Sequence, residues 1–218
     1  MSAARASNDN PVRALAATDP VLARLIDRIG PCRLQPKGEP DLFQALLRSI
    51  IFQQLHGKAA TAIHARVVAL MPQSSAESLH ALPDEFLRGA GLSANKLLAV
   101  RDLAAKTLDG TVPPITVAAK LSDDALIECL TRVRGIGPWT VQMLMIFYLG
   151  RPDVMPASDF GIRKAFSLLY RRGRPVAPAA ILRHARRWRP HRSLASWYLW
   201  RSLDPELALE MPASAGKK

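Results

Sequence analysis

The chain has 218 residues, 49% of them hydrophobic, and 30 Lys and Arg against 18 Asp and Glu give it a formal net charge of +12. This length and composition can bury a real core and predict one globular domain, or two closely apposed lobes. Cys32 and Cys129 are the only cysteines, which excludes a disulfide framework and a four-thiolate zinc or iron–sulfur site.

The sequence gives no sign of a membrane or secretory role. It holds no run of about 18 apolar residues that could span a bilayer. Its start, MSAARASNDNPVRALAAT, lacks the apolar core of a secretory signal. We therefore expect a cytosolic protein that has no membrane partner and whose two cysteines are reduced and inert.

The spacing of apolar residues is helical nearly throughout, and no stretch alternates like a half-buried strand. One apolar stripe covers residues 42–51, and a second covers residues 59–70 after a break at Gly57. Further helices are predicted at residues 93–108, 122–133, 138–149, 159–170, 177–188 and 193–203. The fold class is therefore all-α, with a domain at residues 11–207 between flexible termini at 1–10 and 208–218.

Residues 122–150 are predicted to form a helix, a hairpin and a second helix. Ser122 suits the N-cap of the first helix, and Gly135 and Gly137 turn the chain. Pro138 suits the first position of the second helix, which Gly150 can end in a left-handed conformation. Since the glycines hold no ligand away, backbone N–H groups there can approach a phosphate; an ordinary tight helical hairpin is the alternative.

The positive charge is concentrated toward the end of the chain. No acidic residue lies between Asp159 and Asp204. The basic residues of that segment are Arg163, Lys164, Arg171, Arg172, Arg174, Arg183, Arg186, Arg187, Arg189, Arg192 and Arg201. Such a segment attracts a polyanion, of which nucleic acid is the commonest, although a solvated basic face is the plainer alternative.

Several motifs together resemble the helix-hairpin-helix superfamily of DNA glycosylases. They are LTRVRGIGPWTVQML at 130–144, DVMPASDFGIRKAF at 153–166, IIFQQLHGKAA at 50–60, GLSANKLLAVRDLA at 91–104 and RPHRSLASWYLWR at 189–201. Within the superfamily they look like the alkylpurine branch, the 3-methyladenine DNA glycosylase II type. The resemblance implies a two-lobed helical bundle with a lesion-base cleft between the lobes. It also implies hydrolysis of the N-glycosidic bond of an extruded purine, leaving an abasic site.

The resemblance implies that Asp159 is the catalytic carboxylate. A carboxylate beside the sugar stabilises an oxocarbenium-like transition state and can orient or deprotonate the attacking water. Many relatives carry two adjacent acidic residues at this turn, whereas here Ser158 precedes Asp159, which leaves one candidate. Asp159 also stands where a helix begins, so an ordinary N-cap is its alternative role.

One position separates two mechanisms within the superfamily. Bifunctional relatives carry a lysine two residues after the second hairpin glycine, and its amine attacks the sugar. This chain has Trp139 there. The resemblance therefore predicts a monofunctional glycosylase without Schiff-base chemistry.

The resemblance also implies a pocket for the damaged base. Its candidates are Trp139, His191, Met143 and Phe43. Trp139 could attract a cationic alkylpurine by stacking, or be a core residue that anchors the hairpin. Met143 and Phe43 are equally consistent with core positions. A charged His191 would repel a cationic lesion, so the choice among 3-methyladenine, 7-methylguanine, ethenoadenine and hypoxanthine stays open.

DNA contacts are expected from two places in the chain. In the loop at Gln54, Leu55 and His56, either Leu55 or His56 would fill the gap left by the extruded nucleotide. The alternative is that Leu55 ends a core helix and His56 is a solvated cap. Phosphate contacts are expected from Lys58. In the hairpin they are expected from Gly135, Gly137 and Thr140.

No redox cofactor or nucleotide cofactor is implied. Relatives often hold a monovalent cation, Na⁺ or K⁺, by hairpin carbonyls, which here would be those of Thr131, Val133 and Ile136. We expect a monomer that acts on double-stranded DNA with damaged bases, in the cytoplasm with chromosomal DNA or in a eukaryotic nucleus. The alternative function is a non-catalytic helix-hairpin-helix module that only holds DNA.

Overall fold

A computed structural model describes residues 10–36 and 41–204 of the chain. All regular structure within these residues is helical, which confirms the all-α prediction. None of the described helices combines the length and apolar character of a membrane span. The predicted flexible C-terminus at 208–218 lies outside the described residues, as do residues 1–9, whereas Asn10 caps the first helix through its side chain.

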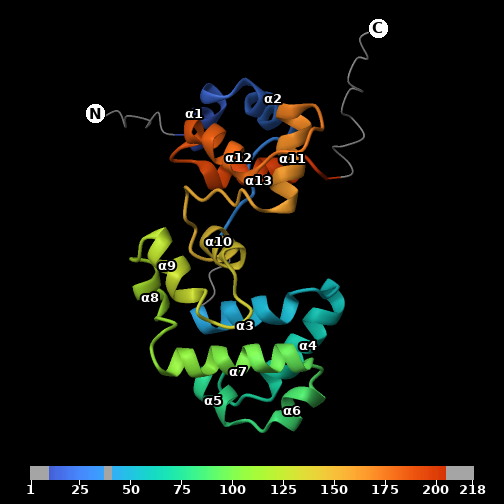
Figure 1. Cartoon of the computed structure of the whole chain (residues 1–218), viewed down its shortest axis with the longest axis vertical. Coiled ribbons are helices and arrows are strands. Elements are labelled where there is room, and N and C mark those ends of the chain that lie inside the picture. Colours follow the sequence, from blue (N-terminus) through green and yellow to red (C-terminus); the bar gives the residue numbers. More distant parts are fainter. Residues whose placement is uncertain (1–9, 37–40, 205–218) are drawn as a thin grey trace, which may run out of the picture. The chain divides into compact units, whose positions relative to one another are not determined.

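The chain forms two compact units (Figure 1). Unit 1 combines the residues up to Gln35 with those from Gly150 onward, and unit 2 runs from Pro36 to Leu149. Unit 1 contains α1 (Pro11–Thr18), α2 (Pro20–Ile29), α11 (Phe160–Arg171), α12 (Pro178–His184), the 3₁₀ turn η1 (Ala185–Trp188) and α13 (Arg192–Arg201). Unit 2 contains α3 (Leu42–Phe52), α4 (Gly57–Ala69), α5 (Ala76–Ala81), α6 (Asp84–Gly89), α7 (Ala94–Leu108), α8 (Ile115–Ala118), α9 (Asp123–Leu130) and α10 (Pro138–Phe147).

Several predicted helix bounds need correction; the helix predicted at 193–203, for example, runs from Arg192 to Arg201. The helix predicted to reach residue 133 ends at Leu130, because the hairpin turn begins there. The helix predicted at 177–188 is divided into α12 and η1. The helix predicted to reach 149 ends at Phe147, although Gly150 does adopt the expected positive φ of 63°.

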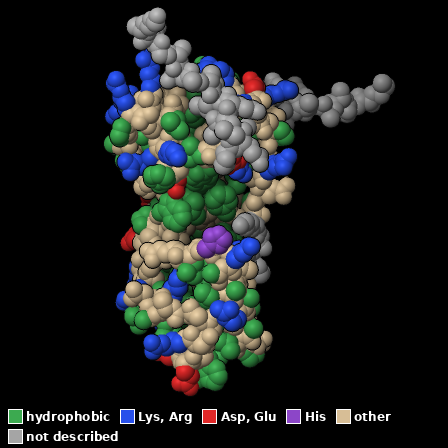
Figure 2. All heavy atoms as spheres, turned by 90° about the vertical axis from the view of Figure 1, so that its right-hand side faces the viewer, with side chains coloured by type: hydrophobic (Ala, Val, Ile, Leu, Met, Phe, Trp, Pro, Cys, Tyr) green, Lys and Arg blue, Asp and Glu red, His purple; other side chains and the backbone are tan. Residues whose placement is uncertain are grey.

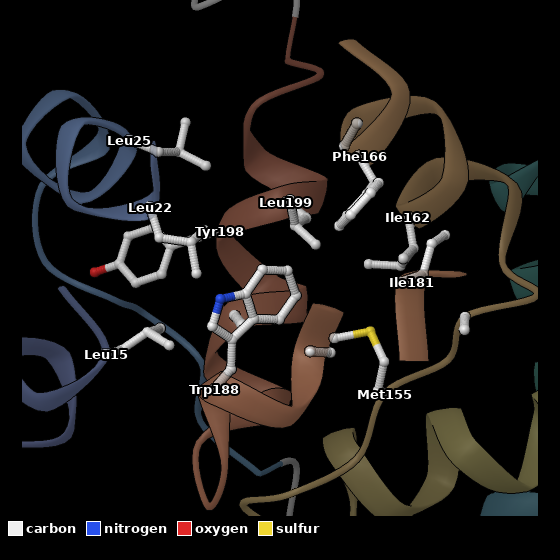
Figure 3. Packing of buried hydrophobic residues seen from close by; sticks show 14 of the residues in the cluster. Leu15, Leu22, Leu25, Met155, Ile162, Phe166, Ile181, Trp188, Tyr198 and Leu199 are labelled. Atoms are coloured by element: carbon white, nitrogen blue, oxygen red, sulfur yellow. The ribbon is translucent and has the colours of Figure 1, made fainter. Parts of the chain in front are cut away.

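Unit 1 is built around one buried tryptophan. Figure 3 shows Trp188 surrounded by Leu22 of α2, Phe166 of α11 and Leu199 of α13. Trp188 is 1% exposed, so the indole brings three separate chain segments into one core. The Tyr198 hydroxyl donates to the carbonyl of Gly30 at 3.0 Å, which ties α13 to the end of α2.

A buried carboxylate completes this core. Asp19 is 2% exposed and caps α2, where it accepts the backbone N–H of Val21 at 2.9 Å. Its Oδ2 lies 3.1 Å from the Tyr170 hydroxyl and 3.0 Å each from His184 Nε2 and Trp188 Nε1. Burial raises the pKa of the Asp19 carboxyl, but the hydrogen bonds from His184, Trp188 and the backbone lower it by more, so the net pKa lies below its ordinary value.

Unit 2 is organised by α7. This helix packs against α3 on one side and α5 on another (Figure 1). Its buried residues include Leu97, Val100 and Leu103. The helices α5, α6 and α8 were not predicted, since four to six residues are too short to show an amphipathic period. The Ser93 hydroxyl accepts the N–H of Lys96 and so fixes where α7 begins.

Candidate functional site

The hairpin between α9 and α10 has the geometry that its glycines predict. Gly135 has a φ of +80°, a left-handed conformation that favours glycine, whereas Gly137 is extended and forms the N-cap of α10. A Cβ added at Gly137 would meet nothing within 4 Å. Pro138 opens α10, and no side chain among the described residues caps this end. The N-terminus of α10 is thus open to a ligand on the side of Gly137.

Two charged residues of α7 form hydrogen bonds with the backbone of the hairpin. The Asp102 carboxylate accepts the backbone N–H of Arg134 at 2.6 Å, and Lys106 donates to the carbonyl of Arg132. Lys106 and Asp102 also form an ion pair of 2.7 Å. Partial burial raises the pKa of the Asp102 carboxyl, but the bonds from Lys106 and Arg134 lower it by more. The motif at 91–104 contains Asp102, but its contact with the hairpin was not predicted.

The loop at Gln53–His56 is fixed to the hairpin by one side-chain amide. Gln53 Nε2 donates to the carbonyl of Gly135 at 2.9 Å. Gln54 has a positive φ of 58°, Leu55 is 38% exposed, and His56 is exposed at the N-cap of α4. Lys58 follows in the first turn of α4 and is also exposed. The structure therefore brings the two predicted DNA-contacting segments of unit 2 together.

Lys96 fixes the end of α3 from which this loop starts. Its Nζ donates to the carbonyls of Ile50 and Ile51 at 2.7 Å and to that of Gln53 at 2.8 Å. These are unpaired carbonyls at a helix C-terminus, where a cation is favoured. Burial lowers the pKa of the Lys96 amine. Lys96, Gln53, Gln54, Arg134 and Gly135 line a cavity of about 480 Å³ between loop and hairpin.

Replacing Lys96 with Met is expected to loosen the loop at Gln53–His56. The apolar stem is retained, but three helix-end carbonyls lose their donor, which should lower the free energy of unfolding by about 1–3 kcal/mol. Urea unfolding measures this loss, and hydrogen exchange should show faster opening at 53–56. Lys120→Met, at an exposed lysine of unit 2, is the matched control and should leave both unchanged. Equal effects of the two variants would contradict this role of Lys96.

In unit 1, Asp159 is held at the start of α11. Its Oδ1 accepts the backbone N–H of Ile162 at 2.8 Å and the indole N–H of Trp200 at 2.8 Å. The N-cap position is as predicted, whereas the role of Trp200 was missed although it lies in the motif at 189–201. Asp159 is half-buried and Ser158 is exposed. The Oδ1 atom of this half-buried residue is therefore fixed by a backbone donor and an indole donor.

Gly161 makes room for this pair. A Cβ built on Gly161 would lie 2.9 Å from Cδ1 of Trp200 and 3.1 Å from Oδ1 of Asp159. The first distance is shorter than side chains tolerate, so any larger residue would displace the indole or the carboxylate. Glycine is needed here for close approach, since Gly161 is not among the glycines with positive φ.

The remaining candidates for the base pocket differ in exposure. Trp139 is 46% exposed on the first turn of α10, and Met143 is half-buried one turn later. His191 is half-buried just before α13. Phe43 is fully buried in the core of unit 2, the packing role that its spacing also allowed. Thr140 is 7% exposed, so little of this residue is accessible from solvent.

The hairpin carbonyls proposed for a cation are partly engaged. The Val133 carbonyl accepts the N–H of Ile136 at 3.0 Å, and the side chains of both residues are buried. Thr131 is the C-cap of α9, and its hydroxyl donates to the Ile127 carbonyl at 2.7 Å. The described residues contain no cluster of His, Cys, Asp and Glu that could hold a metal. Cation binding by these carbonyls stays a prediction.

The basic segment is a surface feature. Of the basic residues between Asp159 and Asp204, all are exposed except Arg192, which is half-buried and donates to Asp153 Oδ1 at 2.7 Å through Nε. Figure 2 shows Lys and Arg side chains spread over the visible face, with few acidic ones among them. This distribution suits a polyanionic partner.

Comparisons with known proteins agree on one family. Residues 47–190 match the model described as HhH-GPD superfamily base excision DNA repair protein. The chain is 38% identical over 184 residues to DNA-3-methyladenine glycosylase 1 of Schizosaccharomyces pombe, which covers 83% of this chain and 80% of that protein.

Two solved structures share the fold over nearly their full length. One is the Schizosaccharomyces pombe 3-methyladenine DNA glycosylase in complex with abasic DNA, with a TM-score of 0.78, 35% identity, and coverage of 88% of this chain and 95% of that chain. The other is a DNA-3-methyladenine glycosidase of Bacillus halodurans, with a TM-score of 0.84, 34% identity and 93% of each chain covered.

Proposed function

This chain belongs to the HhH-GPD superfamily of base excision DNA repair proteins, and from that membership we propose that it is a monofunctional DNA glycosylase for alkylated purines. It extrudes 3-methyladenine or 7-methylguanine from DNA and hydrolyses the N-glycosidic bond, leaving an abasic site. The observation that carries this proposal is the carboxylate of Asp159, fixed by the N–H groups of Ile162 and Trp200 in a chain that matches 3-methyladenine glycosylases over most of its length.

The chemistry requires a negative charge beside the reacting sugar. As the bond to the base breaks, positive charge develops on the sugar, and a carboxylate held in place stabilises it without having to reorganise. Asp159 is suited to this role, since α11 and Trp200 fix its Oδ1 and the residue is only half-buried. Its second carboxylate oxygen can then orient the attacking water.

Replacing Gly161 with Ala is expected to slow base excision about tenfold to a hundredfold, because displacement of a catalytic group by roughly 1 Å has a cost of this order. The added methyl group would displace Trp200 or Asp159. Single-turnover rates on methylated DNA measure the loss. Gly173→Ala is less suitable as a control because Gly173 has a φ of +81°, so Gly89→Ala, at an open helical position, serves instead. An unchanged rate in Gly161→Ala would contradict the packing argument.

Trp139 stands where a Schiff-base mechanism would need an amine. Without that nucleophile, incubation with lesion DNA and borohydride is expected to trap no covalent protein–DNA adduct. A superfamily member with lyase activity, treated in parallel, shows that trapping works. A borohydride-stable adduct with this chain would exclude the monofunctional mechanism.

The partner in this proposal is double-stranded DNA with damaged bases, bound by a protein monomer wherever chromosomal DNA is kept. The N-terminus of α10 would bind a phosphate through backbone N–H groups, and Leu55 or His56 would fill the gap left by the extruded nucleotide. A Na⁺ or K⁺ ion on the carbonyls of Thr131, Val133 and Ile136 would reduce repulsion at the phosphate; no other cofactor is proposed. The short distance from Gln53 to Gly135 supports joint use of loop and hairpin.

A panel of substrates tests the proposal directly. DNA containing 3-methyladenine, 7-methylguanine, ethenoadenine or hypoxanthine is incubated with the full chain, then treated with heat or alkali to cut at abasic sites. We expect breaks at the alkylated purines. If the chain bound all four substrates tightly and none of them was cut, the proposal would be overturned and a non-catalytic DNA-binding module would remain.

A further inference from the structure

Unit 1 contains a second feature that could bind a ligand. A cavity of about 420 Å³ lies among α11, α12 and η1. Its lining includes three rings and three guanidinium groups: Phe166, Tyr170, His184, Arg171, Arg183 and Arg187. Neither Asp159 nor Trp200 lines it, and the hairpin belongs to the other unit. The proposed glycosylase chemistry therefore leaves this cavity without a role.

The rings are held rigidly before any ligand arrives. Tyr170 stacks on the buried Phe166 with centroids 4.5 Å apart, and His184 meets Tyr170 edge-on at 4.5 Å. The Tyr170 hydroxyl and His184 Nε2 both bind the buried carboxylate of Asp19. Since Asp19 engages Nε2, Nδ1 is the imidazole nitrogen left for a ligand. The half-buried Tyr170 and His184 line the cavity, so a ligand there would meet rings that the folded protein already holds in place.

The rim of the cavity is strongly cationic. Arg171, Arg183 and Arg187 are exposed, and no acidic residue lines the cavity among the described residues. The Asp19 carboxylate that Tyr170 and His184 contact is 2% exposed and does not line the cavity. An adjoining cavity of about 270 Å³, lined by Tyr170 and by Arg171, Arg172 and Arg174, extends the same positive surface. Guanidinium groups in such numbers match the geometry of phosphate.

We propose that this cavity binds a nucleotide, with its phosphate among the guanidinium groups and its base against the rings of Tyr170 and His184. Rings and cations side by side distinguish a nucleotide from a bare anion, because every base has a face that stacks. The volume lies within the usual range for small-ligand sites, about 300–1,000 Å³. A base paired inside a duplex cannot reach the rings, so the ligand is a free nucleotide or an unpaired nucleotide of single-stranded DNA.

The test compares ligands on the full chain. Deoxyadenosine monophosphate, inorganic phosphate and a short single-stranded oligonucleotide are titrated separately by calorimetry. We expect saturable binding of the nucleotide that is at least about tenfold tighter than that of phosphate, the difference being the stacked base. If the oligonucleotide binds at least tenfold more tightly than the mononucleotide, and replacing cavity arginines removes that advantage, single-stranded DNA is the source; comparable affinities identify the free nucleotide.

A matched pair of double variants locates the binding. Arg171→Ala/Arg187→Ala removes two charges from the cavity, whereas Lys164→Ala/Arg186→Ala removes two exposed charges from the same unit outside it. We expect at least a tenfold loss of nucleotide affinity in the first and less than a twofold change in the second. In wild-type protein, the Tyr170 ring resonances should shift on nucleotide addition, a readout that needs no variant.

Three results would overturn the proposal. They are equal losses in the two double variants, phosphate binding as tight as nucleotide binding, and the absence of saturable binding by both mononucleotide and oligonucleotide. Base excision by Arg171→Ala/Arg187→Ala is measured separately, since failure of the nucleotide site leaves the proposed glycosylase activity untouched.

Discussion

Asp159→Asn is expected to reduce the single-turnover rate of base excision by roughly 100- to 1,000-fold, the usual cost of removing one preorganised electrostatic group from an active site. The variant keeps the shape of the side chain and one carbonyl oxygen. That oxygen can still accept from Ile162 N–H and from Trp200 Nε1, the two donors that hold Oδ1 in the native protein. Only the negative charge and the second acceptor oxygen are lost.

The variant separates catalysis from folding because Asn is as good an N-cap as Asp. The melting temperature and the affinity for lesion DNA should therefore stay close to those of the native chain. Ser158→Ala, at the exposed neighbour, is the matched control and should excise at the native rate. If Asp159→Asn excised bases at the native rate, the carboxylate would be an ordinary helix cap and the catalytic assignment would be wrong.

Local signals predicted the parts of the fold that depend on neighbouring residues. The hairpin follows from Gly135, Gly137 and Pro138, whose backbone preferences act within a single turn. The cap at Asp159 is equally local. The helices α1 and α2 were missed although Asn10 and Asp19 each precede a proline, a combination that marks a helix start.

The contacts that complete the site join residues far apart in the chain, which is why the sequence did not predict them. Lys96 reaches carbonyls more than forty residues earlier, and Trp200 reaches Asp159 across forty-one residues. No periodicity or spacing specifies such a pair, because it depends on how helices pack. The motifs contained Lys96, Asp102 and Trp200, but a motif states that a residue recurs in a family and leaves its partner unnamed.

Asp19 illustrates the same limit more strongly. Its position before Pro20 is typical of a helix cap, although α2 was not predicted, and in the structure it accepts the N–H groups of Val21 and Leu22. The bonds to His184 and Trp188 span 165 and 169 residues. Asp19 is therefore both the cap of α2 and a buried acceptor for side chains from the other end of the chain. Its replacement should cost more stability than the loss of a cap alone.

Asp19→Asn is expected to lower the free energy of unfolding by about 3 kcal/mol, since it leaves buried donors without an acceptor. The amide can still cap α2 through its oxygen, but its NH₂ group then faces the three donors that Oδ2 accepts from. The Tyr170 hydroxyl can rotate and His184 can change tautomer, whereas the indole N–H of Trp188 can only donate. Urea unfolding at neutral pH measures the loss.

Asp41→Asn is the matched control. Asp41 caps α3 by accepting the N–H of Phe43 at 3.3 Å, so the same substitution there keeps the cap and should change the free energy of unfolding by less than about 0.5 kcal/mol. Equal losses in the two variants would show that the buried donors around Asp19 contribute nothing beyond the cap.

The stability difference between the native chain and Asp19→Asn should depend on pH. The pKa of Asp19 in the folded protein lies below its ordinary value of 3.8, so the stabilisation is fully present above that value and is lost as the pH falls through the folded pKa. Only the native chain titrates at this position, and the other carboxylates cancel in the comparison. The difference should therefore shrink as the pH falls below about 4. A difference that grew as the pH fell would mean that folding raises the pKa of Asp19, which would contradict the donor-rich environment assigned to its carboxylate.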